Sequence, residues 1–259
     1  MDETYQDYVN RVARLTLPHN CSMQLQIIQQ SPKFVDGKPV FFPGYSVITP
    51  PNPEDKTNQS FYTQLVKLQE QLFQQLESGL LISLPPESFH LTAADLIWGD
   101  SYLHVVAENE NFEQNLREQI AASFQQYQQE VKIDSPIEWQ LWGIVIRPRA
   151  IMATLVPKDQ NSYQQIIALR RSLYQNPGLI ALGIEQQYDF TAHITLGYFD
   201  RIPNNLNRDR LCVTLSQIND RLVETKLPLF TVKRLELRKF QNMIDYFRES
   251  DWAVVQFSN

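Results

Sequence analysis

The chain has 259 residues, of which 43% are hydrophobic and 20% charged, and its formal net charge is −6. These values are ordinary for a folded globular protein, and no apolar run approaches the roughly 20 residues that a membrane span needs. The start, MDETYQDYVN, is acidic and polar, unlike a secretory signal. The acidic balance argues against an extended nucleic-acid surface, although it allows a small site for one or two phosphates.

Helical and strand-like segments alternate along the chain. A short helix is expected around residues 3–14, and the segment up to Phe34 is interpreted as an added cap or brace. Apolar residues at helical spacing predict four longer helices, at 61–78, 109–130, 160–175 and 206–222. Five other segments are strand-like, namely 39–49, 137–147, 150–157, 230–240 and 252–257.

The two halves of the chain repeat one order of elements. In each half a helix precedes a stretch that contains a histidine, and a second helix and two strands follow. The residues themselves do not repeat, so the pattern indicates duplicated architecture. Because no low-complexity linker divides the halves, we expect one two-lobed domain over 1–259, with 1–40 as its cap or extension.

Two short motifs occupy matching places in this repeat. His90 and Thr92 lie in ESFHLTAADL, and His193 and Thr195 lie in DFTAHITLGY, which uses half of the 4 histidines of the chain. On a strand, residues two apart point to the same face. Each motif would therefore present an imidazole beside a hydroxyl, and pairing the two units would bring both sets into one cleft.

Such a cleft would suit chemistry at a phosphodiester. The imidazole has a reference pKa of about 6.5, so one ring can accept a proton while the other donates one. Threonine hydroxyls can hold the non-bridging oxygens of the phosphate without adding charge. Two histidines that serve only structural roles are the alternative, but matched motifs at matched positions favour function.

The motifs HLTA at 90–93 and HITL at 193–196 resemble the paired H-x-[ST]-x motifs of the 2H phosphoesterase (LigT-like) superfamily. Together with SPKFVDGKPVFFPGYSVIT and YDFTAHITLGYF, they are similar to a branch known mainly as a domain of unknown function. The resemblance runs from about Ser31 to the C-terminus. It departs from the pattern at Gly44-Tyr45-Ser46, where an asparagine is expected.

The resemblance implies a bilobal α+β fold, in which two antiparallel sheets face a central groove, helices lie outside, and strands cross between the lobes. It also implies that the substrates are 2′,3′-cyclic phosphates, 1″,2″-cyclic phosphates or 2′,5′-linked oligonucleotides. His90 and His193 would be the acid–base pair, and Thr92 and Thr195 would hold the phosphate. Which histidine is the base stays open.

Further residues are candidates for binding the substrate. Cations at the ends of predicted strands could reach the phosphate, and aromatic side chains could stack on a base; these are Arg147, Arg149, Arg238, Lys239, Tyr45, Trp142 and Tyr198. His19 and His104 lack a threonine partner and are interpreted as structural. No metal-ligand spacing surrounds His90 or His193, and no Walker loop is present, so neither a metal nor another cofactor is expected.

The sequence therefore predicts a metal-independent phosphodiesterase that opens a cyclic phosphate on a nucleotide or short RNA end. A non-catalytic module that binds such ends and a 2′,5′ RNA ligase are the alternatives. Cys21 and Cys212 are expected to be free cytosolic thiols, because they are far apart and lack metal-type spacing. We expect a cytoplasmic monomer whose partners include no membrane and no extended nucleic acid.

Overall fold

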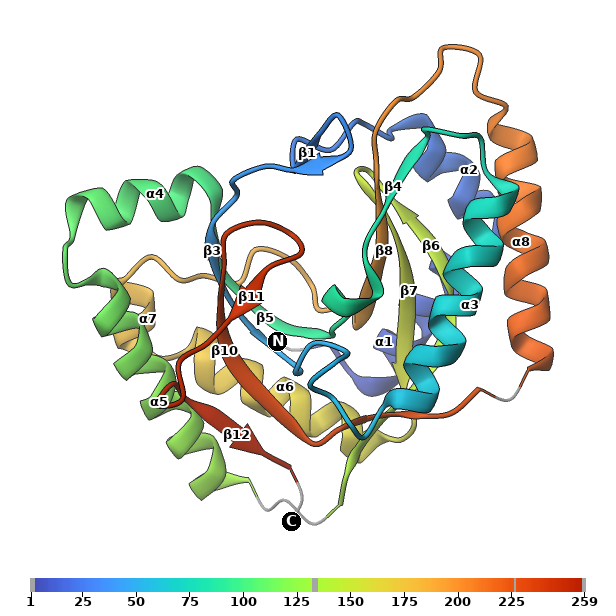
Figure 1. Cartoon of the computed structure of the whole chain (residues 1–259). Coiled ribbons are helices and arrows are strands. Elements are labelled where there is room, and N and C mark those ends of the chain that lie inside the picture. Colours follow the sequence, from blue (N-terminus) through green and yellow to red (C-terminus); the bar gives the residue numbers. More distant parts are fainter. Residues whose placement is uncertain (1–2, 132–134, 226, 258–259) are drawn as a thin grey trace.

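The computed structural model describes residues 3–131, 135–225 and 227–257. Two antiparallel sheets of five strands each stand beside one another, with helices around them, which confirms the expected α+β fold (Figure 1). The β5 sheet consists of β11 (Tyr246–Phe247), β10 (Arg234–Phe240), β3 (Gly44–Ile48) and β5 (Thr92–Trp98) in that order, with β12 (Val254–Gln256) also on β10. The β8 sheet consists of β4 (Leu81–Ser83), β8 (His193–Phe199), β7 (Ala150–Pro157), β6 (Ile137–Arg147) and β9 (Phe230–Val232).

Helices flank both sheets, and a small hairpin of β1 (Phe34–Val35) and β2 (Lys38–Pro39) lies above the gap between them (Figure 1). The helices are α1 (Tyr5–Leu15), α2 (Pro18–Gln26), α3 (Gln59–Gln75), α4 (Gly99–Glu108), α5 (Phe112–Glu130), α6 (Gln160–Tyr174), α7 (Pro177–Ala181) and α8 (Arg208–Glu224). All four longer predicted helices are present within a few residues of their expected bounds. Helix α4 was not expected from the sequence; His104 and Leu103 are exposed on it, whereas Tyr102 is buried.

The strands cross between the sheets. The strands β6 and β7 follow β5 in sequence but belong to the sheet of His193, because β7 pairs with β8 and β6 pairs with β7. In return β10, which follows His193, pairs with β3 in the sheet of β5. Each sheet therefore draws strands from both halves of the chain, as the resemblance implied, and neither sheet is complete without the other half.

Two predicted strands have different bounds in the structure. The segment 230–240 is divided at Lys233, because β9 joins the β8 sheet and β10 joins the β5 sheet. Within the segment 39–49, Pro39 ends β2 and the strand β3 begins only at Gly44. The residues between them connect the β1–β2 hairpin to the β5 sheet. At the start of β3, a Cβ on Gly44 would lie 2.3 Å from the Ile97 carbonyl oxygen, so only glycine allows this close approach.

The first helices form a brace on the β8 sheet. Tyr8 and Val12 of α1 are fully buried, and α2 packs beside α8. A disulfide joins Cys21 of α2 to Cys212 of α8, across 191 residues of sequence. The expectation of free thiols was wrong, because folding brings two cysteines together that the sequence keeps far apart. The bridge also removes the thiol argument for a cytoplasmic location.

Within the described ranges, none of the helices combines the length and the apolar character that crossing a bilayer requires.

We expect the disulfide to contribute to stability. Replacing both cysteines by serine should lower the free energy of unfolding by roughly 2–4 kcal/mol, because the bridge restricts the unfolded chain over a long loop. Urea denaturation under non-reducing conditions measures this loss, and the unmodified protein in excess dithiothreitol should show the same loss. Equal midpoints for all three samples would contradict the prediction.

Candidate active site

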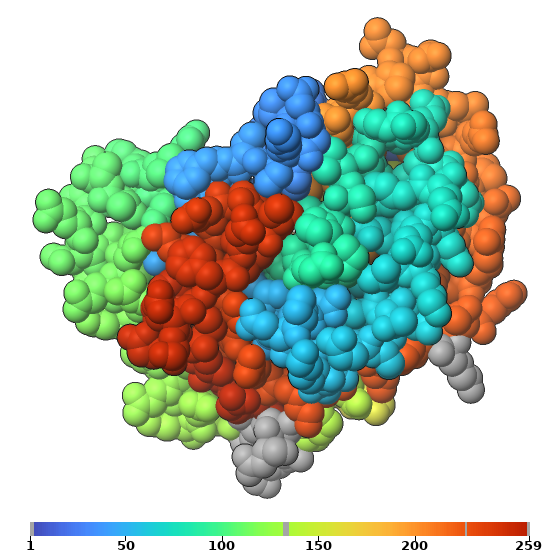
Figure 2. Space-filling model, viewed as in Figure 1, coloured from blue at the N-terminus to red at the C-terminus, as the bar shows by residue number. Residues whose placement is uncertain are grey.

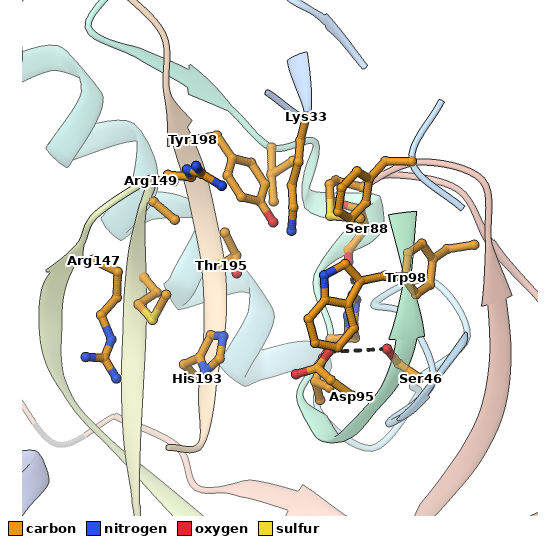
Figure 3. A pocket seen from close by; sticks show the side chains of 18 of the residues that line it. Lys33, Ser46, Ser88, Asp95, Trp98, Arg147, Arg149, His193, Thr195 and Tyr198 are labelled. Carbon is orange, nitrogen blue, oxygen red and sulfur yellow. Dashed lines mark hydrogen bonds between the residues drawn. The ribbon is translucent and has the colours of Figure 1, made fainter. Parts of the chain in front are cut away.

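A cleft of about 730 Å³ opens between the two sheets and is lined from both. His90 and Thr92 line it from the start of β5, and His193 and Thr195 line it from β8. Figure 3 shows His193 and Thr195 on the same side of β8, as the two-residue strand period requires. The structure therefore brings the two motifs, which are a hundred residues apart in sequence, into one cleft.

Both imidazoles are held by the same kind of hydrogen bond. The Nδ1 atom of His90 lies 2.7 Å from the Ser88 carbonyl oxygen, and that of His193 lies 2.6 Å from the Thr191 carbonyl oxygen. A carbonyl only accepts, so in the neutral ring Nδ1 must carry the proton. The Nε2 atom of each ring is thereby left with a free lone pair, which can accept a proton.

Burial makes His90 hard to protonate. Its ring lies with its centroid 4.3 Å from that of Tyr246, and loss of solvent lowers the pKa of His90 to about 4. The Ser88 carbonyl raises this pKa, whereas the charge of a protonated His193 lowers it further. His90 is therefore neutral in the empty cleft at neutral pH.

His193 differs from His90 in the charges around it. Burial lowers the pKa of His193 as well, but the Thr191 carbonyl and then the Asp95 carboxylate oppose this shift. Arg147 and Lys33 act in the other direction. Among the charged groups, the Asp95 carboxylate therefore has the largest influence on the pKa of His193. The charge of His193 has the largest influence on the pKa of His90.

Cations that could bind a phosphate line the same cleft. Arg147 and Arg149, both predicted from sequence, lie at the end of β6 and in the turn after it, and Lys33 reaches in from the segment before β1 (Figure 3). In the described part of the chain, none of the three forms an ion pair. Burial lowers the pKa of Arg147, and an anion in the cleft would offset this cost.

Two of the predicted cations do not line the cleft. Arg238 is 3% exposed and donates to the Glu236 carboxylate at 2.6 and 2.8 Å and to Glu54 at 3.1 Å, so its charge is already neutralised. Lys239 points to the other face of β10, where it pairs with Glu113. The structure therefore places neither side chain at the cleft, because carboxylates bind Arg238 and the alternation along β10 turns Lys239 to the opposite face.

Two of the three predicted stacking residues also lie elsewhere. Tyr45 is fully buried between Tyr102 and Trp252, on the face of β3 that points away from the cleft. Trp142 is 36% exposed on β6 and does not line the cleft. Tyr198 does line it, as expected.

The sequence analysis missed several residues of the cleft. Trp98 ends β5 and lines the cleft beside the motifs, and Lys33 lies with its Nζ atom 5.2 Å from the centre of the Tyr198 ring. Asp95 accepts a hydrogen bond from Ser46 at 3.3 Å (Figure 3) and another from Tyr188. A strict two-residue period from Thr92 would place Asp95 on the opposite face of β5, but the pairing of β3 with β5 shifts register on both sides of Ser46 and Val47, and Asp95 lines the cleft.

The remaining histidines lie outside the cleft. His104 is exposed on α4, 3.4 Å from Glu108, and His19 is exposed on α2. Among the described residues, no three His, Cys, Asp or Glu side chains are grouped in a way that could hold a metal ion. The groups that line the cleft include the two imidazoles, the hydroxyls of Thr92 and Thr195, three cations and the Asp95 carboxylate.

The low pKa of His90 makes stability depend on pH. The folded pKa of about 4 lies below the ordinary value of about 6.5, so the unfolded chain binds more protons and stability falls as the pH drops from 6.5 towards 4. The variant His90→Gln has no titrating imidazole at this position and so lacks this pH-dependent contribution to stability. Its melting temperature should therefore fall less than that of the unmodified protein between pH 7 and pH 5, which calorimetry can measure. An equal fall in both proteins would contradict the assigned pKa.

Solved structures include chains that are similar to this one in fold. No family model matches the sequence, and no curated protein does. Among solved structures, a conserved protein of unknown function from Agrobacterium tumefaciens, ATU0111, matches with a TM-score of 0.60 at 14% identity, over 88% of this chain and 91% of that chain. E. coli LigT in apo form matches with a TM-score of 0.42 at 11% identity, over 84% of this chain and 99% of that one. LigT in complex with 3′-AMP matches with a TM-score of 0.37 at 12% identity, over 77% and 88%.

The likeness to the Agrobacterium protein, at 14% identity over most of both chains, shows a shared fold. Structures of LigT and of a phosphoesterase are also among the matches of this chain, whose two motifs resemble the 2H phosphoesterase superfamily.

Proposed function

We propose that the chain is a metal-independent phosphodiesterase that opens a cyclic phosphate, 2′,3′-cyclic or related, on a nucleotide or short RNA end. One observation carries the proposal. Two imidazoles from opposite sheets line one cleft, and each binds a backbone carbonyl through Nδ1, so that each Nε2 is left for the substrate. Ring opening needs one proton removed and one delivered, which such a pair can supply.

The reaction follows from the groups in the cleft. The oxygen of a water molecule attacks phosphorus while one imidazole takes its proton, and the bond from phosphorus to one ribose oxygen breaks. The other imidazole, protonated, delivers its proton to that oxygen, and a phosphomonoester results. The hydroxyls of Thr92 and Thr195 donate to the non-bridging oxygens, and Arg147 and Lys33 offset the negative charge.

The surroundings of the two rings favour different roles. Burial lowers the pKa of both histidines, that of His90 to about 4. The Asp95 carboxylate opposes this at both rings and has the largest influence of the charged groups on His193, whereas at His90 the charge of His193 has a larger influence than Asp95. We therefore assign His90 as the base and His193 as the acid. A bound phosphate anion raises the pKa of a nearby imidazole and so completes the protonation of the acid.

The size and the rim of the cleft favour a small substrate. A volume of about 730 Å³ is in the range of pockets that bind nucleotide-sized ligands. Trp98 and Tyr198 offer aromatic faces on which a base could stack. Three cations line this cleft in a chain of net charge −6, which favours a nucleotide or a short end over a long nucleic acid.

We expect both imidazoles to be needed for turnover. His90→Ala and His193→Ala should each lower the turnover of 2′,3′-cyclic nucleotides by about 10² or more, because each removes one proton transfer. Product formation is measured by chromatography with EDTA present throughout. His104→Ala, which removes an exposed histidine of α4, is the matched control and should keep full activity.

The same assay separates the alternatives. A non-catalytic module would bind 3′-AMP in calorimetry and show no turnover with any cyclic substrate. A ligase would join a cyclic-phosphate end to a 5′-hydroxyl end of RNA faster than water opens the ring. Activity that chelator abolishes would contradict the metal-independent mechanism.

The pH dependence provides a second test. Catalysis needs one protonated and one neutral imidazole, and both rings have pKa values below the ordinary one, that of His90 at about 4. The profile of kcat/KM should therefore be bell-shaped, with its maximum below pH about 6.5 and its acid limb near pH 4. The profile of kcat should lie at higher pH, because bound phosphate favours the protonated ring. A kcat/KM that is constant from pH 4 to pH 8 would argue against the pair.

A further inference from the structure

A tyrosine of α1 is inserted into the strand ladder just before His193. Next to the last β7–β8 pair, the Leu155 amide donates to the Ala192 carbonyl oxygen at 2.8 Å. An antiparallel pair normally exchanges two such bonds. Here the Ala192 amide instead donates to the Tyr8 hydroxyl at 2.9 Å, and that hydroxyl donates to the Leu155 carbonyl oxygen at 3.0 Å. One phenol oxygen thus replaces a direct bond between the strands.

Arg11, three residues further along α1, holds the two residues before Ala192. Its guanidinium donates to the Thr191 hydroxyl at 2.8 Å and to the Phe190 carbonyl oxygen at 2.6 Å. The Glu3 carboxylate accepts from the same group at 2.7 and 2.8 Å and raises the pKa of Arg11, which keeps it charged. Three consecutive residues that lead into His193 are therefore bound to side chains of α1.

This segment is also the one that orients the ring of His193. The Thr191 carbonyl accepts the Nδ1 proton of His193 at 2.6 Å, so its position determines the tautomer and the direction of Nε2. Tyr8 itself is fully buried, with its ring beside Trp139 and Phe190 at centroid distances of 6.0 and 6.1 Å, so its hydroxyl has little freedom to move.

The residue after His90 is held by the segment that follows β3, and among the described residues no side chain of α1 takes part. There the Leu91 amide donates to the Thr49 hydroxyl at 2.9 Å, and the Leu91 carbonyl accepts from the Thr49 amide at 2.9 Å, both from the residue after β3. Equivalent carbonyl bonds thus hold the two imidazoles, but the residues that position these segments differ. In the described part of the chain, the segment before His193 is bound by Tyr8 of α1, which is more than 180 residues away in sequence.

We propose that Tyr8 is a positioning residue for His193, which it orients through Ala192 and the Thr191 carbonyl, with Arg11 as its support. The inference rests on the proposed function, in which His193 is the acid. Without the phenol oxygen, either the ladder closes directly or two buried backbone groups lose their partner. In both cases the Thr191 carbonyl moves relative to the ring. Helix α1 then has two roles, because it braces the β8 sheet and also positions a catalytic histidine.

The test is Tyr8→Phe, which removes one oxygen and keeps the ring. We expect kcat for 2′,3′-cyclic nucleotides to fall about tenfold and KM to stay within about twofold, because the acid is misplaced while the phosphate contacts remain. The ¹⁵N spectrum of the histidine side chains should show His193 shifted towards the other tautomer and His90 unchanged. Tyr127→Phe is the matched control, since it removes the hydroxyl of another buried tyrosine, which lies on α5 and packs against Phe257 outside the cleft. It should leave kcat and the His193 signals as they are.

The outcomes separate this inference from the proposed function. A folded Tyr8→Phe protein with unchanged kcat and unchanged His193 signals would overturn the inference. If the unmodified protein turns over no cyclic substrate, the proposed function fails, and the His193 signals alone then decide whether Tyr8 positions the ring. If Tyr8→Phe does not fold, Arg11→Gln replaces it, because the Arg11 side chain is only partly buried. A shift of the His193 signals in that variant supports the inference, and its absence overturns it.

Discussion

The structure depends on one hydrogen bond that occurs twice, from the Nδ1 atom of a histidine to the carbonyl oxygen two residues before it. At His90 the acceptor is Ser88, and at His193 it is Thr191. The bond determines which nitrogen carries the proton and which one faces the cleft. It forms locally, within three residues, so either motif could make it alone. The proposed acid–base reaction, however, needs both rings at one phosphate, and only the tertiary structure can bring them together.

The crossing of strands between the sheets meets this requirement. The strands β6 and β7 follow His90 but build the sheet that contains β8, and β10 follows His193 but pairs with β3, so the chain passes repeatedly from one sheet to the other. Helix α6 adds a direct link, since Tyr174 donates to the Asp95 carbonyl oxygen at 2.7 Å and Arg170 donates to the Ala93 carbonyl oxygen. The distance between the imidazoles is therefore determined by a shared core, which a rigid acid–base pair needs.

The cleft is lined by positively charged side chains although the chain as a whole is acidic. Its net charge is −6, yet Lys33, Arg147 and Arg149 line the space beside the two imidazoles. Asp95 lines the same cleft and favours the protonated form of both rings, with the larger relative influence on His193. Arg238 shows the contrast. It is buried among carboxylates at 2.6–3.1 Å, where it stabilises the β5 sheet and has no charge to offer a ligand.

The sequence by itself determined what local periodicity controls: the longer helices, most strands, and the pairing of His90 with Thr92 and of His193 with Thr195 on one face. It could not determine which cations and aromatic residues reach the cleft, because that depends on the register between strands far apart in sequence, and a shift of one residue exchanges the two faces. Tyr45 and Lys239 point away from the cleft for this reason, and Asp95 and Ser46 point into it. The disulfide of Cys21 and the contact of Tyr8 with Ala192 likewise exist only after folding, since each joins segments more than 180 residues apart that no local pattern connects.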